Sequence, residues 1–124
     1  LSRYASHCDF IELDKQAATQ LKSNLTLVNA SNTAATGVHQ GDALNILKGI
    51  SDAPYDIIFV DPPFAKGLVA PTLAAIVDNN LVQSGSVIYL EHESTLVTPL
   101  LPAHWNIIKD KQTSALRYML IEVN

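Results

Sequence analysis

The residues best suited to chemistry follow a short apolar run, IIFV, where the chain continues as Asp61-Pro62-Pro63-Phe64. An aspartate offers two acceptor oxygens, and prolines present their carbonyls in a stiff frame because they have a fixed φ and no N–H. Two acceptors held side by side suit an –NH₂ group, which has two protons to donate. The Phe64 ring could stack on a planar heterocycle that bears this amine. The turn therefore predicts a pocket for an exocyclic amine, and the alternative interpretation is that the prolines only end the strand.

Four apolar runs each end on an acidic residue: Glu12, Asp42, Asp61 and Glu91. In a doubly wound sheet the carboxyl ends of the parallel strands meet at one edge, where ligands bind, so we expect these carboxylates to converge. The alternative is helix capping, which we favour for Asp14 and leave open for Asp42. Glu12 suits capping poorly, and a carboxylate there is well placed to accept hydrogen bonds from a ribose diol.

The elements that must position these groups alternate along the chain. Helical spacing of apolar residues predicts helices over 14–28, 43–47 and 68–77. Segment 30–37 is expected to be a loop, and DKQTS the turn of a closing antiparallel hairpin. Strands are expected at 8–13, 37–40, 55–60, 86–91, 105–108 and 116–123. This order predicts an α/β fold with a mostly parallel sheet, helices on both faces, and a single domain over residues 1–124.

Composition restricts the class of protein. With 48% apolar and 16% charged residues the chain is globular rather than disordered. No apolar run approaches the roughly 20 residues of a membrane span, and the one cysteine, Cys8, excludes an internal disulfide and fits a reducing, cytoplasmic setting. The net charge of −4 argues against this segment binding the phosphate backbone of a nucleic acid by itself. The four histidines show no metal-ligand spacing, so no metal site is expected.

The Asp61-Pro62-Pro63-Phe64 turn resembles the Asp/Asn-Pro-Pro-aromatic motif of S-adenosylmethionine-dependent amino-methyltransferases, which act on adenine N6, guanine N2 or protein glutamine. The wider sequence is similar to the RsmD family, which methylates N2 of a guanine in 16S rRNA. The similarity is carried by LSRYAS, FIELDKQAATQLKSNL, GDALNIL, YDIIFVDPPFAKGL and the closing hairpin. It implies a Rossmann-like class I methyltransferase fold, a cytoplasmic enzyme, and 16S rRNA or a small-subunit assembly intermediate as partner.

The resemblance implies a set of cofactor-binding residues for S-adenosylmethionine. Glu12 would bind the ribose and Asp42 would lie near the adenine, and Leu13 and Ala43 would also bind the cofactor. Asp61 would contact the cofactor from the neighbouring strand end.

The resemblance also implies the catalytic residues. Asp61 and the Pro62 carbonyl would hold the target amine, Pro63 would complete the rigid turn, and Phe64 would stack on the flipped-out base. Hydrogen bonds from the amine to these acceptors would aim its lone pair at the methyl group, so positioning and electrostatics would supply most of the catalysis.

The sequence departs from the family at its glycine-rich cofactor loop. The five glycines, at positions 37, 41, 49, 67 and 85, include no pair with G-x-G spacing. We expect the loop and the first strand upstream of Leu1, with that strand lying between the strands that end at Glu12 and Asp61. Without it, we expect open sheet edges that favour self-association, weak cofactor affinity and poor activity.

Two other hypotheses remain open. The four-residue motif fits an adenine-N6 nucleic-acid methyltransferase equally well, and only the wider similarity favours guanine in rRNA. The absent glycine loop favours a non-catalytic Rossmann-like fragment.

Overall fold

The computed structural model describes residues 7–12, 16, 19–20, 35–50, 53–61 and 67–124. Contacts between residues divide the chain into two compact units, Leu1–Lys48 and Gly49–Asn124, which are described separately below as unit 1 and unit 2. The single domain expected from the sequence stays a prediction. No helix in the described ranges is both long and apolar enough to cross a membrane.

Unit 1 contains two parallel strands, β1 (His7–Glu12) and β2 (Ala35–Gln40). Their register runs from His7 opposite Ala35 to Glu12 opposite Gln40, so both strands end at the same edge. A hydrogen bond of 3.1 Å between His39 Nε2 and Asp9 Oδ1 joins the two strands through their side chains. The short helix α2 (Ala43–Ile46) follows directly. Strand pairing thus brings the two strand ends, and the helix that follows them, to one place.

The prediction of a loop over residues 30–37 is wrong for the last three residues, because β2 begins at Ala35. Alanine, threonine and glycine have little strand preference of their own, but strand preference depends strongly on context. Pairing with β1 supplies the backbone hydrogen bonds that make these residues a strand. Of the helix expected over 14–28, residues Gln16, Thr19 and Gln20 are described, and they are helical and exposed.

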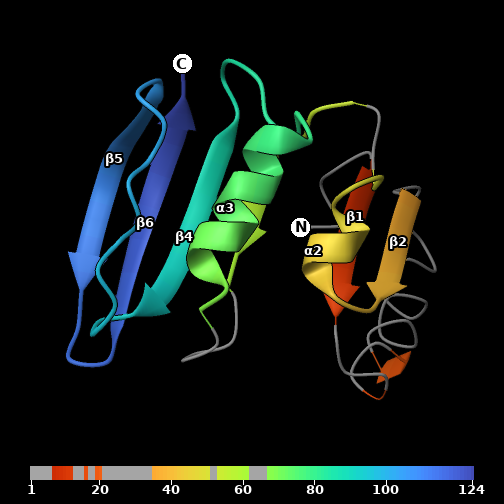
Figure 1. The fold of residues 1–124 in the computed structure, drawn as a ribbon, viewed down its shortest axis with the longest axis horizontal. Helices are drawn as coiled ribbons and strands as arrows, with labels where there is room; N and C mark the ends of the chain where they lie inside the picture. Colours follow the sequence, from red (N-terminus) through yellow and green to blue (C-terminus); the bar gives the residue numbers. More distant parts are fainter. Residues whose placement is uncertain (1–6, 13–15, 17–18, 21–34, 51–52, 62–66) are drawn as a thin grey trace. The chain divides into compact units, whose positions relative to one another are not determined.

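Unit 2 contains one four-stranded sheet and one helix (Figure 1). In chain order its elements are β3 (Ile57–Val60), α3 (Val69–Asp78), β4 (Val87–Glu93), β5 (Trp105–Gln112) and β6 (Leu116–Val123). The strand order is β3-β4-β6-β5, with β3 parallel to β4 and the other neighbours antiparallel. The sheet is therefore mixed, with the closing hairpin that the sequence predicts. Within the described residues β1 and β3 each pair along one edge only, and a further strand between them stays a prediction.

One face of this sheet forms the core of unit 2. Side chains alternate along a strand, and in β4 every second residue is buried, from Ile88 through Leu90 to His92. Met119 and Ile121 of β6 are 1% and 0% exposed on the same face. Helix α3 lies over β3 and β4 in Figure 1 and buries Val69, Leu73 and Ile76. Burial of these apolar side chains is the main force that holds unit 2 together.

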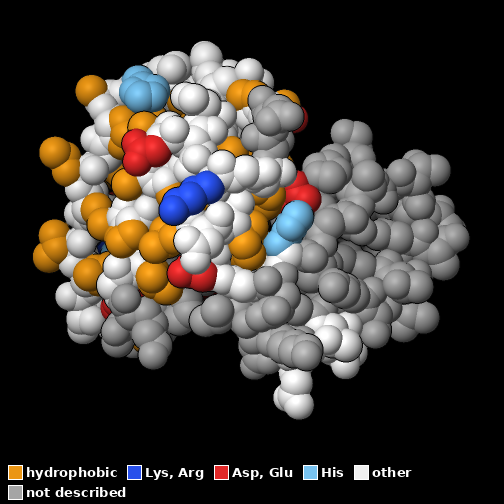
Figure 2. Space-filling model, turned by 45° about the vertical axis from the view of Figure 1, so that its right-hand side comes forward, with side chains coloured by type: hydrophobic (Ala, Val, Ile, Leu, Met, Phe, Trp, Pro, Cys, Tyr) orange, Lys and Arg blue, Asp and Glu red, His pale blue; other side chains and the backbone are white. Residues whose placement is uncertain are grey.

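The opposite face of the sheet, here called the open face, is much less covered. Phe59 and Ile57 on β3 are 59% and 45% exposed, although both are large and apolar. The strand registers arrange the open face in three rows running from β3 to β5. The rows are Ile57–Val87–Glu122–Asn106, then Phe59–Tyr89–Leu120–Lys109, then Asp61–Glu91–Tyr118–Lys111, in which Asp61 follows the last paired residue of β3. Figure 2 is turned by 45° from Figure 1, in which α3 lies in front of the sheet, and it shows hydrophobic side chains at the surface on that side among few charged ones.

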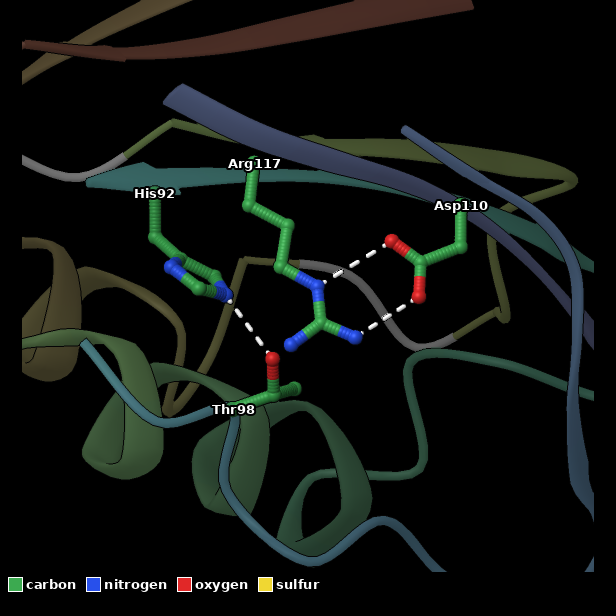
Figure 3. A network of polar contacts seen from close by, with 4 residues as sticks. All are labelled: His92, Thr98, Asp110 and Arg117. Atoms are coloured by element: carbon green, nitrogen blue, oxygen red, sulfur yellow. Dashed lines mark hydrogen bonds and ion pairs between the residues drawn. The ribbon is translucent and has the colours of Figure 1, made fainter. Parts of the chain in front are cut away.

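The hairpin turn expected at DKQTS is shorter than predicted, because β5 continues to Gln112. Pairing with β6 keeps Asp110, Lys111 and Gln112 in the strand. Asp110 also accepts two hydrogen bonds from Arg117, of 3.1 Å from Nε and 2.7 Å from an Nη, and Figure 3 shows the two groups facing each other. These hydrogen bonds lower the pKa of Asp110 below its usual value and raise that of Arg117. Cross-strand pairing and charge thus override the turn preference of polar residues.

The lowered pKa of Asp110 gives a pH dependence that can be measured. Because the folded pKa lies below the unfolded value of about 3.9, the pair stabilises the fold above that value. This contribution is lost as the pH falls through the folded pKa. We expect Asp110→Asn to reduce the free energy of unfolding at pH 6–7 slightly, about as for a surface pair, and to have no effect at the lowest pH. Denaturant unfolding of both proteins across the acid range measures this.

Asp78→Asn is the matched control, since Asp78 is exposed at the end of α3 and lies outside the pair. A difference between wild type and Asp110→Asn that grows on acidification would contradict the prediction.

His92 links β4 to the segment that follows it. The ring is fully buried, and Nδ1 lies 2.7 Å from the Glu93 carbonyl oxygen, which can only accept. Nδ1 therefore carries the proton, and in the neutral ring Nε2 accepts the hydrogen bond of 3.0 Å from the Thr98 hydroxyl (Figure 3). Both nitrogens of this buried side chain are satisfied.

Candidate functional site

Two of the four predicted acids lie on neighbouring strands of unit 2. Val60 at the end of β3 is opposite Leu90 of β4 in a parallel pair. Asp61 directly follows β3, and Glu91 is the next residue of β4, which continues to Glu93. Neighbouring strands lie about 4.8 Å apart, and both acids belong to the open face. The strand expected to end at Glu91 continues to Glu93, and a shared binding role for Asp61 and Glu91 stays a prediction.

Tyr89 and Phe59 lie immediately behind these acids on the open face. Their ring centroids are 5.7 Å apart and the rings are tilted by 46°. Desolvation raises the pKa of the Tyr89 phenol, and the Glu91 carboxylate, Tyr118 and Asp61 raise it further. Tyr89 is therefore a protonated hydrogen-bond donor at neutral pH, held close to both acids. Within residues 53–61 and 67–124, neither carboxylate makes a hydrogen bond or ion pair.

Sequence analysis did not name Tyr89 among the candidate site residues. Tyr89 is half-buried, and it lies on the open face rather than the face that forms the core. The signal was present in the alternation of VIYLEHE, where Tyr89 and Glu91 are two residues apart and so share a face. Phe59 shares the face of Asp61 for the same reason.

The other predicted catalytic residues, Pro62, Pro63 and Phe64, lie outside the described residues. The amine pocket formed by these residues with Asp61 therefore stays a prediction.

The predicted cofactor residues lie in unit 1. Glu12 ends β1 directly beside the end of β2, and its backbone position is described. Asp42 is exposed and caps α2, because its Oδ1 accepts a hydrogen bond of 3.0 Å from the backbone N–H of Leu44. The capping role left open for Asp42 is thus confirmed for one of its oxygens. Ala43 begins α2, and Leu13 lies outside the described residues.

These positions fit a nucleoside cofactor in the chemistry they offer. A carboxylate at a strand end next to a parallel neighbour is the arrangement that accepts hydrogen bonds from a ribose diol. Gly41 has a φ of 145° between β2 and Asp42, and a Cβ there would come within 3.4 Å of Ile46 Cδ1. The close turn therefore depends on glycine and lets Asp42 begin the helix at the strand end. Because Asp61 and Glu91 belong to the other unit, convergence of all four acids stays a prediction.

Comparison with known proteins identifies the family. A family model described as conserved hypothetical protein 95 matches residues 1–122, nearly the whole chain. The chain belongs to this family. The resemblance to the RsmD family is confirmed by relatives named ribosomal RNA small subunit methyltransferase D. That of Haemophilus influenzae is 36% identical over 98% of this chain and 63% of its own length, and that of Escherichia coli is 35% identical over 98% and 60%.

Solved structures agree with the fold expected for the RsmD family. A structure from Escherichia coli assigned as a methyltransferase has a TM-score of 0.85 and 34% identity, covering 99% of this chain and 66% of that one. A structure from Haemophilus influenzae assigned as a methylase has a TM-score of 0.84 and 33% identity, covering 98% and 75%. The Rossmann-like methyltransferase fold is therefore confirmed. The chain spans 60–63% of the length of these two curated relatives.

Proposed function

We propose that this chain takes part in S-adenosylmethionine-dependent methylation of the exocyclic N2 amine of a guanine in small-subunit rRNA. The observation that carries the proposal is the sequence Asp61-Pro62-Pro63-Phe64 directly after β3, in a chain that matches the family over residues 1–122. Two relatives named ribosomal RNA small subunit methyltransferase D support the substrate class. The partner is then 16S rRNA or an assembly intermediate of the small subunit, in the cytoplasm.

The residues at the end of β3 act on the target amine. The nitrogen lone pair of guanine N2 is delocalised into the ring, which makes the amine a poor nucleophile. The Asp61 carboxylate and the Pro62 carbonyl each accept one N–H of the amine, and this favours a pyramidal nitrogen whose lone pair is free. Phe64 stacks on the base and fixes its plane, with Pro63 keeping the turn rigid. The methylated nitrogen then loses a proton, which water can accept.

The residues of unit 1 hold the cofactor. S-adenosylmethionine, when bound, supplies the methyl group on a positively charged sulfur. Glu12 holds the ribose and Asp42 lies near the adenine, while Leu13, Ala43 and Asp61 also contact the cofactor. This assignment requires residues 1–124 to form one catalytic domain, as the sequence predicts.

The test uses the whole chain with isotopically labelled S-adenosylmethionine and small subunits that lack the guanine-N2 modification. Digestion of the rRNA and mass spectrometry then identify the labelled nucleoside. Labelled N2-methylguanosine supports the proposal. Labelled N6-methyladenine, with duplex DNA offered as the competing substrate, would instead support the adenine hypothesis. Binding of the cofactor or rRNA with no transfer in either substrate would support a non-catalytic fragment.

A further inference from the structure

We propose that Glu91 accepts the N1–H of the target guanine and thereby selects guanine over adenine. The inference deepens the proposed function and rests on it, because it names the residue that decides which base is methylated. It follows from the place of Glu91 in the sheet of unit 2 and from the donors and acceptors that the two purines present.

Glu91 lies beside the residue that is proposed to hold the reacting amine. Val60 is opposite Leu90 in the parallel pair of β3 and β4, so the next residues, Asp61 and Glu91, are neighbours on strands about 4.8 Å apart. Side chains at such paired positions lie on the same face of a sheet. The two carboxylates therefore leave adjacent strands on the same side.

Tyr89 is a second indication that both carboxylates lie close together. Desolvation raises the pKa of the Tyr89 phenol, and the Glu91 carboxylate, Tyr118 and Asp61 raise it further. A charge has such an effect on an ionisable group only when it is nearby. Asp61 and Glu91 are thus both near one aromatic ring, which shares their face of the sheet.

Guanine presents the donors that two neighbouring carboxylates require. Its Watson–Crick edge carries the N1–H next to the N2 amine, so three N–H bonds lie side by side. In the proposed reaction Asp61 and the Pro62 carbonyl accept the two protons of the amine, and Glu91 accepts the proton on N1. Hydrogen bonds to a charged acceptor are stronger than those between neutral groups. Each donor also reduces the repulsion between the two carboxylates.

Adenine cannot make the same contacts. Its N1 carries a lone pair and no proton, and this lone pair would face the oxygens of the Glu91 carboxylate. A site built to hydrogen-bond an N–H of its substrate strongly rejects an analogue that lacks it, because the acceptor is left unpaired. Glu91 therefore separates the guanine and adenine hypotheses, which the four-residue motif that begins at Asp61 does not do.

Two substrates that differ at N1 test the proposal while the reacting amine stays in place. Small subunits are reconstituted with guanine or with 2-aminopurine at the methylated position, because 2-aminopurine carries the same amine but no proton on N1. We expect the wild-type chain to prefer guanine by on the order of 10²-fold in kcat/KM. Glu91→Gln is expected to lower this ratio about tenfold or more, because a side-chain amide can donate to the unprotonated N1.

Glu122→Gln is the matched control for this variant. Glu122 is exposed on β6 and lies opposite Val87 at the start of β4, so the same charge is removed at the other end of the strands. We expect this control to keep the wild-type ratio between the two substrates. Circular dichroism of each variant verifies that it is folded.

An unchanged ratio in Glu91→Gln, with both substrates slowed equally, would overturn the proposal and leave Glu91 only a structural role. Equal kcat/KM values of the wild-type chain for guanine and 2-aminopurine would overturn it without any variant. In both cases guanine is still methylated, so the proposed function stands. If the wild-type chain transfers no methyl group to guanine, the proposed function itself is overturned, and this inference with it.

Discussion

Replacing Asp61 by alanine is expected to lower the rate of methyl transfer to small-subunit rRNA by on the order of 10²–10³-fold. Losing one preorganised group that hydrogen-bonds the reacting centre has a comparable effect in other enzymes. Asp61 lies at the carboxyl end of β3 and is exposed, so its removal leaves no buried cavity. The rate of label transfer with saturating rRNA, compared with the wild-type rate, measures the effect. The variant should keep its thermal unfolding midpoint, because exposed side chains contribute little to stability.

Asp56→Ala provides the matched control for this experiment. Asp56 immediately precedes β3 and is exposed, so it lies at the opposite end of the same strand. We expect its rate to stay within about twofold of wild type, as for most surface substitutions. A similar loss of rate in both variants would show that charge near β3, rather than a contact to the amine, is responsible. Full activity of Asp61→Ala would exclude Asp61 from the reaction.

Leu90→Ala is expected to reduce the free energy of unfolding of unit 2 by about 2–5 kcal/mol. Leu90 is 0% exposed on β4, which has a hydrogen-bonded strand on each side. Removing three carbons there loses apolar burial and leaves a cavity beneath α3 that the neighbouring side chains fill only in part. Guanidinium unfolding followed by the fluorescence of Trp105, which is 5% exposed in the same unit, measures the change.

Leu100→Ala makes the same chemical change at a side chain that is fully exposed. Its free energy of unfolding should stay within about 0.5 kcal/mol of wild type. Equal destabilisation by the two substitutions would mean that the face under α3 is not the core of unit 2.

The strands were predictable wherever hydrophobic pattern decides structure. The apolar run IIFV forms β3 and the alternating segment VIYLEHE forms β4. Both were predicted because burial of their apolar side chains under α3 stabilises these strands. The errors lie where a partner strand decides instead. Ala35 and Lys111 belong to polar or small-residue stretches, and they are in strands because β1 and β6 pair with them. Such pairing is invisible in a local stretch of sequence.

The candidate site was predictable for similar reasons, and to a similar extent. Parallel pairing in register places the residue after β3 next to the residue of β4 that follows Leu90, so Asp61 lies beside Glu91. The position of Tyr89 could not be predicted without knowing which face of the sheet α3 covers, because a tyrosine is found both in cores and at partly exposed surfaces. Asp42 could not be resolved because capping and ligand binding use the same carboxylate, and only the N–H of Leu44 shows that one oxygen is occupied.

The strand order of unit 2 has a consequence for how the protein is made. Strand β6 follows β4 and β5 in the chain but lies between them in the sheet. During translation β4 and β5 therefore emerge from the ribosome before the strand that joins them has been synthesised. The sheet can close only after β6 has left the exit tunnel, so unit 2 folds after all of its strands have been translated. Until then the apolar side chains of β4 remain open to chaperones.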